Sequence, residues 1–305
     1  MPIINFHYFH NDNHPPCQGS FSRSQFDKIL DKIQKDYILI SPHQCLKRLE
    51  KGVFTEEYAT ISFDCGLKSQ FDIAFPALQE RGITAFWFLY TLSLKEPVNI
   101  EKYHHFRFFC YKRIDDFYSE YIAAVKKMYG VETVTTAKRE ILETNFLGWS
   151  SYYTSQDKLY KFLRDHILGY ERHNAVMECL IKQKRYNIDE HKANLFLTRE
   201  NIETLYDAGN VIGLHTHTHP NDIGAMPFAD QRFEYQTNKE ILESIINEPV
   251  IVMSHPCNSY NDLTIQVLKE LGIKFGFRSN DDGIARGLYE IPRINSTDFV
   301  RTMVL

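Results

Sequence analysis

The sequence lacks the features that mark several classes of protein. Its six cysteines stand at positions 17, 45, 65, 110, 179 and 257, and no two have CxxC spacing. This scatter argues against a disulfide framework and predicts free thiols in a reducing, cytoplasmic setting. No apolar run is long enough to span a bilayer. The first residues, MPIINFHYFHNDNH, lack the basic region and apolar segment of a secretory signal, so we expect a cytoplasmic protein without a transmembrane segment.

The sequence also lacks a large charge of either sign. Its formal net charge is −4, its pI is about 6.4, and it has no long basic run, so we expect no nucleic-acid partner. Hydrophobic residues make up 43% and charged residues 24%, as in ordinary globular proteins. Aromatic residues are abundant at 14%, which fits either a thick core or a site that binds flat or sugar-like ligands.

The pattern along the chain predicts one α/β unit with an insertion. Short apolar runs alternate with amphipathic helical patterns over residues 1–93 and again over 196–305, in about seven β/α units. Such alternation predicts a parallel sheet or a β/α barrel. Residues 94–195 carry only long helical patterns, so we predict a helical insertion there. We expect this insertion to cover the barrel mouth or to form a contact in a homo-oligomer.

Three histidines follow a predicted strand in VIGLHTHTHP, residues 211–220. If the chain turns once in helical form after the strand, His215 and His219 meet as residues four apart, a spacing that suits two imidazoles on one divalent metal. His217 then faces elsewhere. The alternative is a surface loop of polar residues that satisfy one another. It leaves unexplained why the histidines follow a buried strand, at the edge of the sheet where sites are built.

The stretch ISFDCG, residues 61–66, places a second polar group at the end of a buried strand. The Asp64 carboxylate there must be solvated, paired or used. One alternative is that Asp64 caps the next helix, although that helix starts some residues later. Cys65 is either a small buried hydrophobe or a metal ligand.

These stretches resemble motifs of the polysaccharide deacetylases, the fourth family of carbohydrate esterases. Residues 60–89, which contain TISFDCG, are similar to the first motif, and residues 197–220, which end in HTHTHP, are similar to the second. Residues 250–279, which contain VMSHPCN, are similar to the third. The stretches INFHYF and IPRI match the chain ends of one branch. The resemblance covers the chain outside residues 94–195.

The resemblance implies a distorted (β/α)7 barrel that hydrolyses an N-acetyl or related N-acyl amide on a sugar. It also implies a divalent metal held by an Asp and two His. Carried over by position, Asp64 is the catalytic base, and His215 and His219 are metal ligands. Thr216 would brace their loop by hydrogen bonding, and His217 falls on a free position.

One departure from the family concerns the metal. The second Asp of the first motif, the third metal ligand of the family, is Cys65 here. A thiolate is a good zinc ligand, and a Cys/His/His set leaves one coordination position open, so we predict Zn²⁺. Alternatively, Cys65 abolishes metal binding and leaves a weakened or non-catalytic relative.

A second departure concerns the proton donor, because the family's late Leu-His motif is absent. His255, at the end of a predicted strand, is our candidate for the general acid, and Arg293 is expected to orient Asp64. A backbone N–H group near Asn258 to Tyr260 is expected to bind the oxyanion of the substrate. Further candidates for the donor are His10, His104 and His105.

The sequence therefore predicts a hydrolase of carbon–nitrogen bonds other than peptide bonds. We expect a metal-dependent N-deacetylase that acts on a saccharide, a sugar nucleotide or a lipid-linked sugar, in surface-glycan biosynthesis. Two alternatives stay open: a binding protein that has lost catalysis, and a hydrolase of another amide, such as an N-formyl sugar.

Overall fold

The structure is a computed structural model that describes residues 1–305 except 54, 97–98, 149–152, 281–285 and 303–305. The chain divides into two compact units. Unit 1 comprises Met1–Val98 and Lys192–Leu305, and unit 2 comprises Asn99–His191. Among the described residues, no helix is both long enough and apolar enough to cross a membrane.

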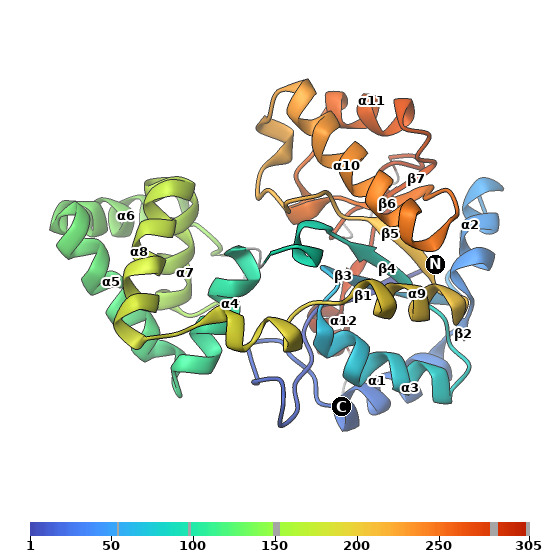
Figure 1. Ribbon diagram of the computed structural model, residues 1–305, viewed down its shortest axis with the longest axis horizontal. Coiled ribbons are helices and arrows are strands. Elements are labelled where there is room, and N and C mark those ends of the chain that lie inside the picture. Colours follow the sequence, from blue (N-terminus) through green and yellow to red (C-terminus); the bar gives the residue numbers. More distant parts are fainter. Residues whose placement is uncertain (54, 97–98, 149–152, 281–285, 303–305) are drawn as a thin grey trace. The chain divides into compact units, whose positions relative to one another are not determined.

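Unit 1 is built on one sheet of parallel strands (Figure 1). The strands are β1 (Ile3–Phe6), β2 (Ile38–Leu39), β3 (Tyr58–Asp64), β4 (Phe86–Leu89), β5 (Val211–Leu214), β6 (Val252–Ser254), β7 (Phe275–Phe277) and β8 (Ile294–Asn295). Their order is β7-β6-β5-β4-β3-β1-β8, and β2 pairs with β3 beside this path. A bridge from Phe277 to Ile291 brings the segment that leads into β8 alongside β7, so the sheet curls. This confirms the predicted fold class.

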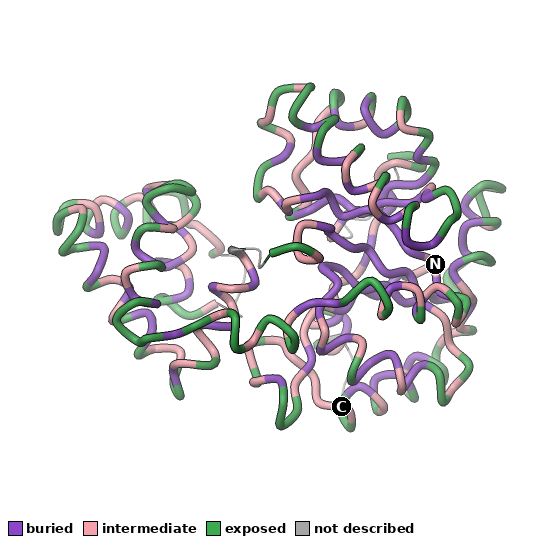
Figure 2. Tube along the Cα trace, viewed as in Figure 1, coloured by how far each residue is buried: buried purple, intermediate pink, exposed green. Residues whose placement is uncertain are grey.

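Successive residues of a strand point to opposite faces of the sheet, and in unit 1 each face packs into its own hydrophobic core with helices. The helices of unit 1 are α1 (Arg23–Asp36), α2 (Pro42–Glu50), α3 (Phe75–Glu80), α9 (Arg199–Asp207), α10 (Phe228–Ile246), α11 (Asp262–Glu270) and α12 (Ser296–Thr302). Phe6, Phe63 and Trp87 belong to a large core shared with α1, α3, α9, α10 and α11. Phe86 and Phe88 face the opposite way, into a smaller core shared with α2. In Figure 2 most of the sheet is accordingly buried, and exposed positions lie on the outer sides of the helices.

Unit 2 is helical. It contains α4 (Asn99–Cys110), α5 (Ile114–Tyr129), α6 (Val131–Thr144), α7 (Ser155–Phe162) and α8 (Gly169–Lys184), with a π-helical turn, Leu163–Leu168, between the last two. Its aromatic core includes Phe106, Phe117, Tyr121 and Tyr160 and is separate from the cores of unit 1. The bounds of unit 2 lie within the predicted insertion of residues 94–195. Its role as a lid or an oligomer contact stays a prediction.

Candidate active site

Polar side chains gather where the parallel strands of unit 1 end. Asp64 ends β3, His215 directly follows β5, and Ser254 ends β6. Because neighbouring parallel strands end at the same edge, residues far apart in the sequence meet there. Asp64 pairs in register with Phe88 of β4, and Leu214 pairs with Met253, so the strand ends are aligned. The sheet therefore positions one candidate site at its carboxyl edge.

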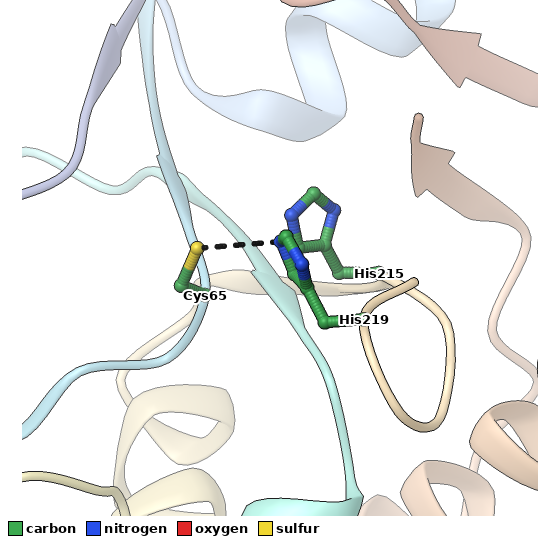
Figure 3. Close-up of side chains that lie close together, drawn as sticks. All are labelled: Cys65, His215 and His219. Carbon is green, nitrogen blue, oxygen red and sulfur yellow. Dashed lines mark hydrogen bonds between the residues drawn. The ribbon is translucent and has the colours of Figure 1, made fainter. Parts of the chain in front are cut away.

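Cys65, His215 and His219 converge at this edge (Figure 3). Their potential ligand atoms all lie within 4.8 Å of one another, and all three residues are buried. Cys65 Sγ lies 3.9 Å from His219 Nε2, and the two imidazole centroids are 4.8 Å apart. The structure thus brings together the three residues that the sequence nominated as metal ligands.

The backbone reaches this arrangement through left-handed conformations. Cys65 has φ 78°, Thr216 has φ 66° and His219 has φ 58°. Such values are uncommon for residues other than glycine and cluster at functional sites. Gly66, with φ 69°, continues the turn after Cys65, and a Cβ atom there would lie 2.9 Å from Leu89 Cδ2. His215 and His219 therefore meet across a bent loop, and the helical turn that we expected between them is wrong.

Side chains of α10 hold this loop in place. Glu234 accepts hydrogen bonds from the backbone N–H groups of His217 and Thr218, at 2.9 and 2.8 Å, and from the Thr218 hydroxyl at 2.6 Å. Asn238 accepts from the His215 N–H at 2.9 Å and donates to the Leu89 carbonyl at 3.0 Å. Both side chains are buried. The loop is therefore fixed from outside the metal-ligand cluster.

Two other residues of the loop have structural contacts. Thr216 is buried, and its hydroxyl donates to the His215 carbonyl, as a bracing residue would. His217 Nδ1 lies 2.9 Å from the Thr91 hydroxyl, and the backbone carbonyl of His217 accepts from the Leu92 N–H. His217 is thus occupied by contacts with the segment after β4 and is buried, not exposed.

The His215 ring is oriented by Ser254. Its Nδ1 lies 3.1 Å from the Ser254 carbonyl and 2.9 Å from the Ser254 hydroxyl. An N–H at Nδ1 that donates to the carbonyl leaves Nε2 as a lone-pair ligand. Burial lowers the pKa of His215 to about 3 and that of His219 to about 4, against the raising effect of the Asp64 charge. Both imidazoles are therefore neutral near pH 7, which is the form that binds metals.

Asp64 is held on every side, so it does not cap a helix. Its two oxygens accept hydrogen bonds from Arg293 at 2.7 Å each, and further bonds come from Asn5 at 3.0 Å and Ser254 at 3.1 Å. Burial alone would raise the pKa of Asp64, but the charge of Arg293 and its hydrogen bonds bring it well below the ordinary value. Asp64 is therefore a permanent carboxylate and a weak proton acceptor.

His7 is a site residue that the sequence reasoning missed. It follows β1, and its Nε2 lies 3.7 Å from Asp64 Oδ2. The Gln70 amide donates to the carbonyls of both His7 and Asp64, at 2.7 Å each, and so joins the two strand ends. The His7 side chain is 28% exposed, whereas that of Asp64 is 2% exposed. The sequence pattern could have identified His7, because it stands at the end of a strand, as Asp64 and His215 do.

His255 has contacts that disfavour its role as the general acid. Its Nε2 lies 2.8 Å from the Tyr289 carbonyl, and its ring stacks on Tyr260 with 4.2 Å between centroids. Burial lowers its pKa to about 4, so it is neutral near pH 7. Because Ser254 points toward Asp64, the next residue along the strand points to the other face. The alternative donor His10 is bonded to Ser20, whereas His104 and His105 belong to unit 2.

Several groups of the predicted oxyanion site have partners within the protein. The backbone N–H groups of Asn258 and Ser259 donate to carbonyls within their own turn. The Asn258 amide oxygen accepts from the Ser279 N–H at 3.1 Å, and the Tyr260 hydroxyl donates to Glu290 at 2.8 Å. These contacts engage the side chains of Asn258 and Tyr260, and the role of this segment in binding the substrate stays a prediction.

A family model described as "Polysaccharide deacetylase" matches residues 171–276, which include the loop with His215 and His219. This confirms the resemblance to the polysaccharide deacetylase family. The match covers less than half of the chain and begins within α8. Polysaccharide deacetylases are hydrolases of carbon–nitrogen bonds other than peptide bonds, the enzyme class predicted from the sequence. A search of curated proteins gives no match.

Solved polysaccharide deacetylases share the fold. The chain is 17% identical to the Streptococcus pyogenes deacetylase PplD in complex with acetate, with a TM-score of 0.58, and covers 98% of that chain. It is 13% identical to a de-N-acetylase from Aggregatibacter actinomycetemcomitans, with a TM-score of 0.57, and covers 99% of it. For IcaB from Ammonifex degensii the identity is 14%, the TM-score 0.56 and the coverage 90%. The three matches cover 96% or more of this chain.

The donor set of this polysaccharide deacetylase relative fits a zinc ion. Tetrahedral zinc with one thiolate and two imidazoles places ligand atoms about 3.5 Å apart, as bond lengths near 2.3 and 2.0 Å require. The separation of 3.9 Å between Cys65 Sγ and His219 Nε2 is close to this value. His215 has the orienting partner that metal-bound histidines usually have. His219 lacks one among the described residues, because its Nδ1 is buried without a hydrogen bond.

Proposed function

We propose that this protein is a zinc-dependent N-deacetylase that removes an acetyl group from an amino sugar. One observation carries the proposal: the ligand atoms of Cys65, His215 and His219 lie within 4.8 Å of one another. The Ser254 hydroxyl connects the His215 ring of this cluster to the Asp64 carboxylate. The names of the solved neighbours, a deacetylase with bound acetate and a de-N-acetylase, support the acetyl group as the one released.

Zinc at this position would supply a Lewis acid for the amide carbonyl and the attacking water. The chain's own residues provide proton transfer and orientation. We assign proton transfer to His7, since it is partly exposed and lies beside a fixed carboxylate. Burial lowers the pKa of His7 below 6.5, against the raising effect of the Asp64 charge, so near pH 7 the neutral ring can accept a proton and later release it to the amine. Asp64 would stabilise the imidazolium formed between these steps.

The substrate is proposed to be a saccharide precursor of a surface glycan, in a cytoplasmic setting. The resemblance of the sequence to one branch of polysaccharide deacetylases supports this proposal. The His7 side chain is partly exposed, so such a ligand could approach the site from its side.

A binding protein without catalysis is the second candidate. It is favoured by Cys65, which replaces a family carboxylate, and by Asp64, whose oxygens are occupied by Arg293, Asn5 and Ser254. In this case the buried ion pair serves only to hold the strand ends together. Metal binding and catalysis must therefore be tested separately.

The test uses the purified full chain. Zinc content is measured by mass spectrometry, and acetate or formate release is measured on N-acetylated and N-formylated amino-sugar oligomers. We expect one zinc per chain and acetate release, and loss of both in His215→Ala. His10→Ala, in which the replaced ring contacts Ser20 instead of the site, is the matched control. Zinc without hydrolysis would favour the binding protein, formate release would favour the N-formyl hydrolase, and a chain that binds no zinc would contradict the proposal.

A further inference from the structure

Unit 2 holds an arginine, Arg107, without a polar partner among the described residues. Arg107 of α4 packs its guanidinium carbon 5.1 Å from the ring centroid of Tyr160 and 5.7 Å from that of Phe117. Its Nε is buried and makes no hydrogen bond. Within the part of the chain that the structure describes, Arg107 forms no ion pair either. A buried Nε–H donor without an acceptor is costly unless a ligand or water completes it.

A second cation lies one residue after Tyr160, the ring on which Arg107 packs. Lys161, near the end of α7, has its Nζ 4.9 Å above the ring of Tyr153 and makes no hydrogen bond or ion pair with any described residue. Burial, together with the charges of Arg164 and Arg107, lowers its pKa to about 8, against the raising effects of Asp165 and Asp157. Because Arg107 packs on Tyr160 and Lys161 directly follows Tyr160, the two cations lie beside the same turn of α7.

The carboxylates of this region are engaged elsewhere. Asp165 is bound by both Nε and Nη2 of Arg164, at 2.5 and 2.8 Å. Asp157 accepts hydrogen bonds from the Tyr118 hydroxyl and from the backbone N–H and hydroxyl of Thr154. Neither carboxylate therefore forms an ion pair with Arg107 or Lys161, and the region keeps an excess of positive charge.

We propose that Arg107 and Lys161 form a phosphate-binding site within unit 2. A guanidinium presents paired N–H donors and an ammonium adds three more, which is the chemistry that binds phosphate oxygens. The adjoining π-helical turn, Leu163–Leu168, is a conformation often found at functional sites. The phosphate is either the free anion or a phosphoryl group on a sugar. The site does not depend on the function proposed for unit 1.

The experiment measures binding of inorganic phosphate and of a sugar phosphate to the full chain by calorimetry, at constant ionic strength with chloride as the reference salt. We expect Arg107→Met and Lys161→Met each to weaken binding about tenfold or more, since each removes charge-assisted hydrogen bonds. Arg139→Met is the matched control, because Arg139 on α6 is 66% exposed and its loss changes the net charge equally. Tighter binding of the sugar phosphate would identify the sugar-borne group, and equal binding would identify the free anion.

Thermal unfolding separates this site from a purely structural role. Without phosphate, both methionine variants should unfold at or above the temperature of the wild type, because a charge without a counterion has been removed. With phosphate, only the wild type and Arg139→Met should gain stability. Absence of phosphate binding at millimolar concentration, or equal binding by all four proteins, would overturn the proposal. A variant that unfolds early without phosphate would instead show that its cation stabilises the aromatic core.

Discussion

Both oxygens of Asp64 accept a hydrogen bond of 2.7 Å from the guanidinium of Arg293. The arginine side chain is fully buried, and that of the aspartate is 2% exposed. Asn5 donates to Asp64 and accepts from Arg293, so the pair is completed by further hydrogen bonds. A buried pair in this geometry binds the ends of β1 and β3 to the segment before β8. It also keeps one fixed negative charge beside the proposed metal site.

Removal of one member of this pair should destabilise unit 1 strongly. Arg293→Met leaves the buried Asp64 carboxylate without its main partner, and we expect a loss of about 3–5 kcal/mol in the free energy of unfolding. The double variant Arg293→Met with Asp64→Asn should recover much of this loss, because no unpaired charge remains. Urea unfolding of the wild type, the two single variants Arg293→Met and Asp64→Asn, and the double variant measures the coupling energy between the two residues. Additive effects of the two substitutions would contradict a direct ion pair.

His7→Gln should separate chemistry from metal binding. We expect kcat/KM for acetate release to fall by about 10²- to 10⁴-fold, the usual contribution of general acid–base catalysis. Zinc content and unfolding temperature should stay at wild-type values, because the His7 side chain is partly exposed and its carbonyl still accepts from Gln70.

The pH profile gives an independent measurement. Since the pKa of His7 is lowered, wild-type kcat/KM should fall only below about pH 6.5, where the ring becomes protonated. This limb should be absent from the residual activity of His7→Gln. If His7→Gln keeps the wild-type kcat/KM, a group other than His7 transfers the proton. His255→Gln serves as the comparison, because His255 is bonded to the Tyr289 carbonyl instead.

The sequence was sufficient for the fold class and for the meeting of Cys65, His215 and His219. Strand–helix alternation predicts a parallel sheet, and residues that follow such strands meet at one edge. The sequence was not sufficient to tell which histidine at that edge lies beside Asp64. His7 and His255 both stand at strand ends, and only the direction of each side chain shows that His7 approaches Asp64 while His255 turns away.

The backbone conformation of the loop that carries His215 and His219 also could not be predicted from the sequence. Spacing of four residues suggested a helical turn, but side chains of α10 stabilise left-handed conformations at Thr216 and His219 instead. Such contacts between distant elements have no signature in a local pattern. The state of Asp64 was hidden for the same reason, since it depends on the bidentate contact with Arg293.

Cys65→Asp should change the metal preference of the site. Thiolate is a softer ligand than carboxylate, so the ratio of zinc to manganese affinity should fall about tenfold or more. Competition with a metal-indicator dye measures both affinities. Cys45→Ala is the control thiol, because Cys45 is buried in α2 within a hydrophobic core. If Cys65→Asp and Cys65→Ala bind zinc as tightly as the wild type, the thiol is not a ligand.

Acid should destabilise unit 1 well before its carboxylates titrate. The pKa values of His215, His219 and His255 are lowered by burial to about 3, 4 and 4. Between these values and 6.5 the unfolded chain binds more protons than the folded chain, so stability rises with pH and is lost as pH falls through this window.

Fluorescence of the buried Trp87, in a Trp149→Phe background with chelator present, reports the unfolding of unit 1. The slope of unfolding free energy against pH gives the number of protons taken up on unfolding. Near pH 5 we expect this number to be smaller by about one in His255→Gln than in the wild type. An unchanged slope would mean that His255 is protonated in the folded protein. His10→Gln should keep the wild-type slope.

The contacts from α10 predict that zinc affinity depends on residues that never touch the metal. Glu234 and Asn238 hold the backbone of the loop that carries His215 and His219, so their loss should let the loop relax from its left-handed conformations. Substitution of groups that orient metal ligands typically costs about 10- to 100-fold in affinity, and we expect Glu234→Ala and Asn238→Ala to fall in this range.

Glu234→Gln tests whether geometry or charge matters. Its amide oxygen can still accept from the His217 and Thr218 N–H groups, so it should retain most of the zinc affinity that Glu234→Ala loses. Lys239→Ala on the same helix removes an ion pair with Glu243 and should leave zinc affinity unchanged. Equal zinc affinity in Glu234→Ala and the wild type, with only a lower unfolding temperature, would reduce this network to ordinary packing. Weaker binding in Glu234→Ala with recovery in Glu234→Gln would show that α10 sets the geometry of the metal loop.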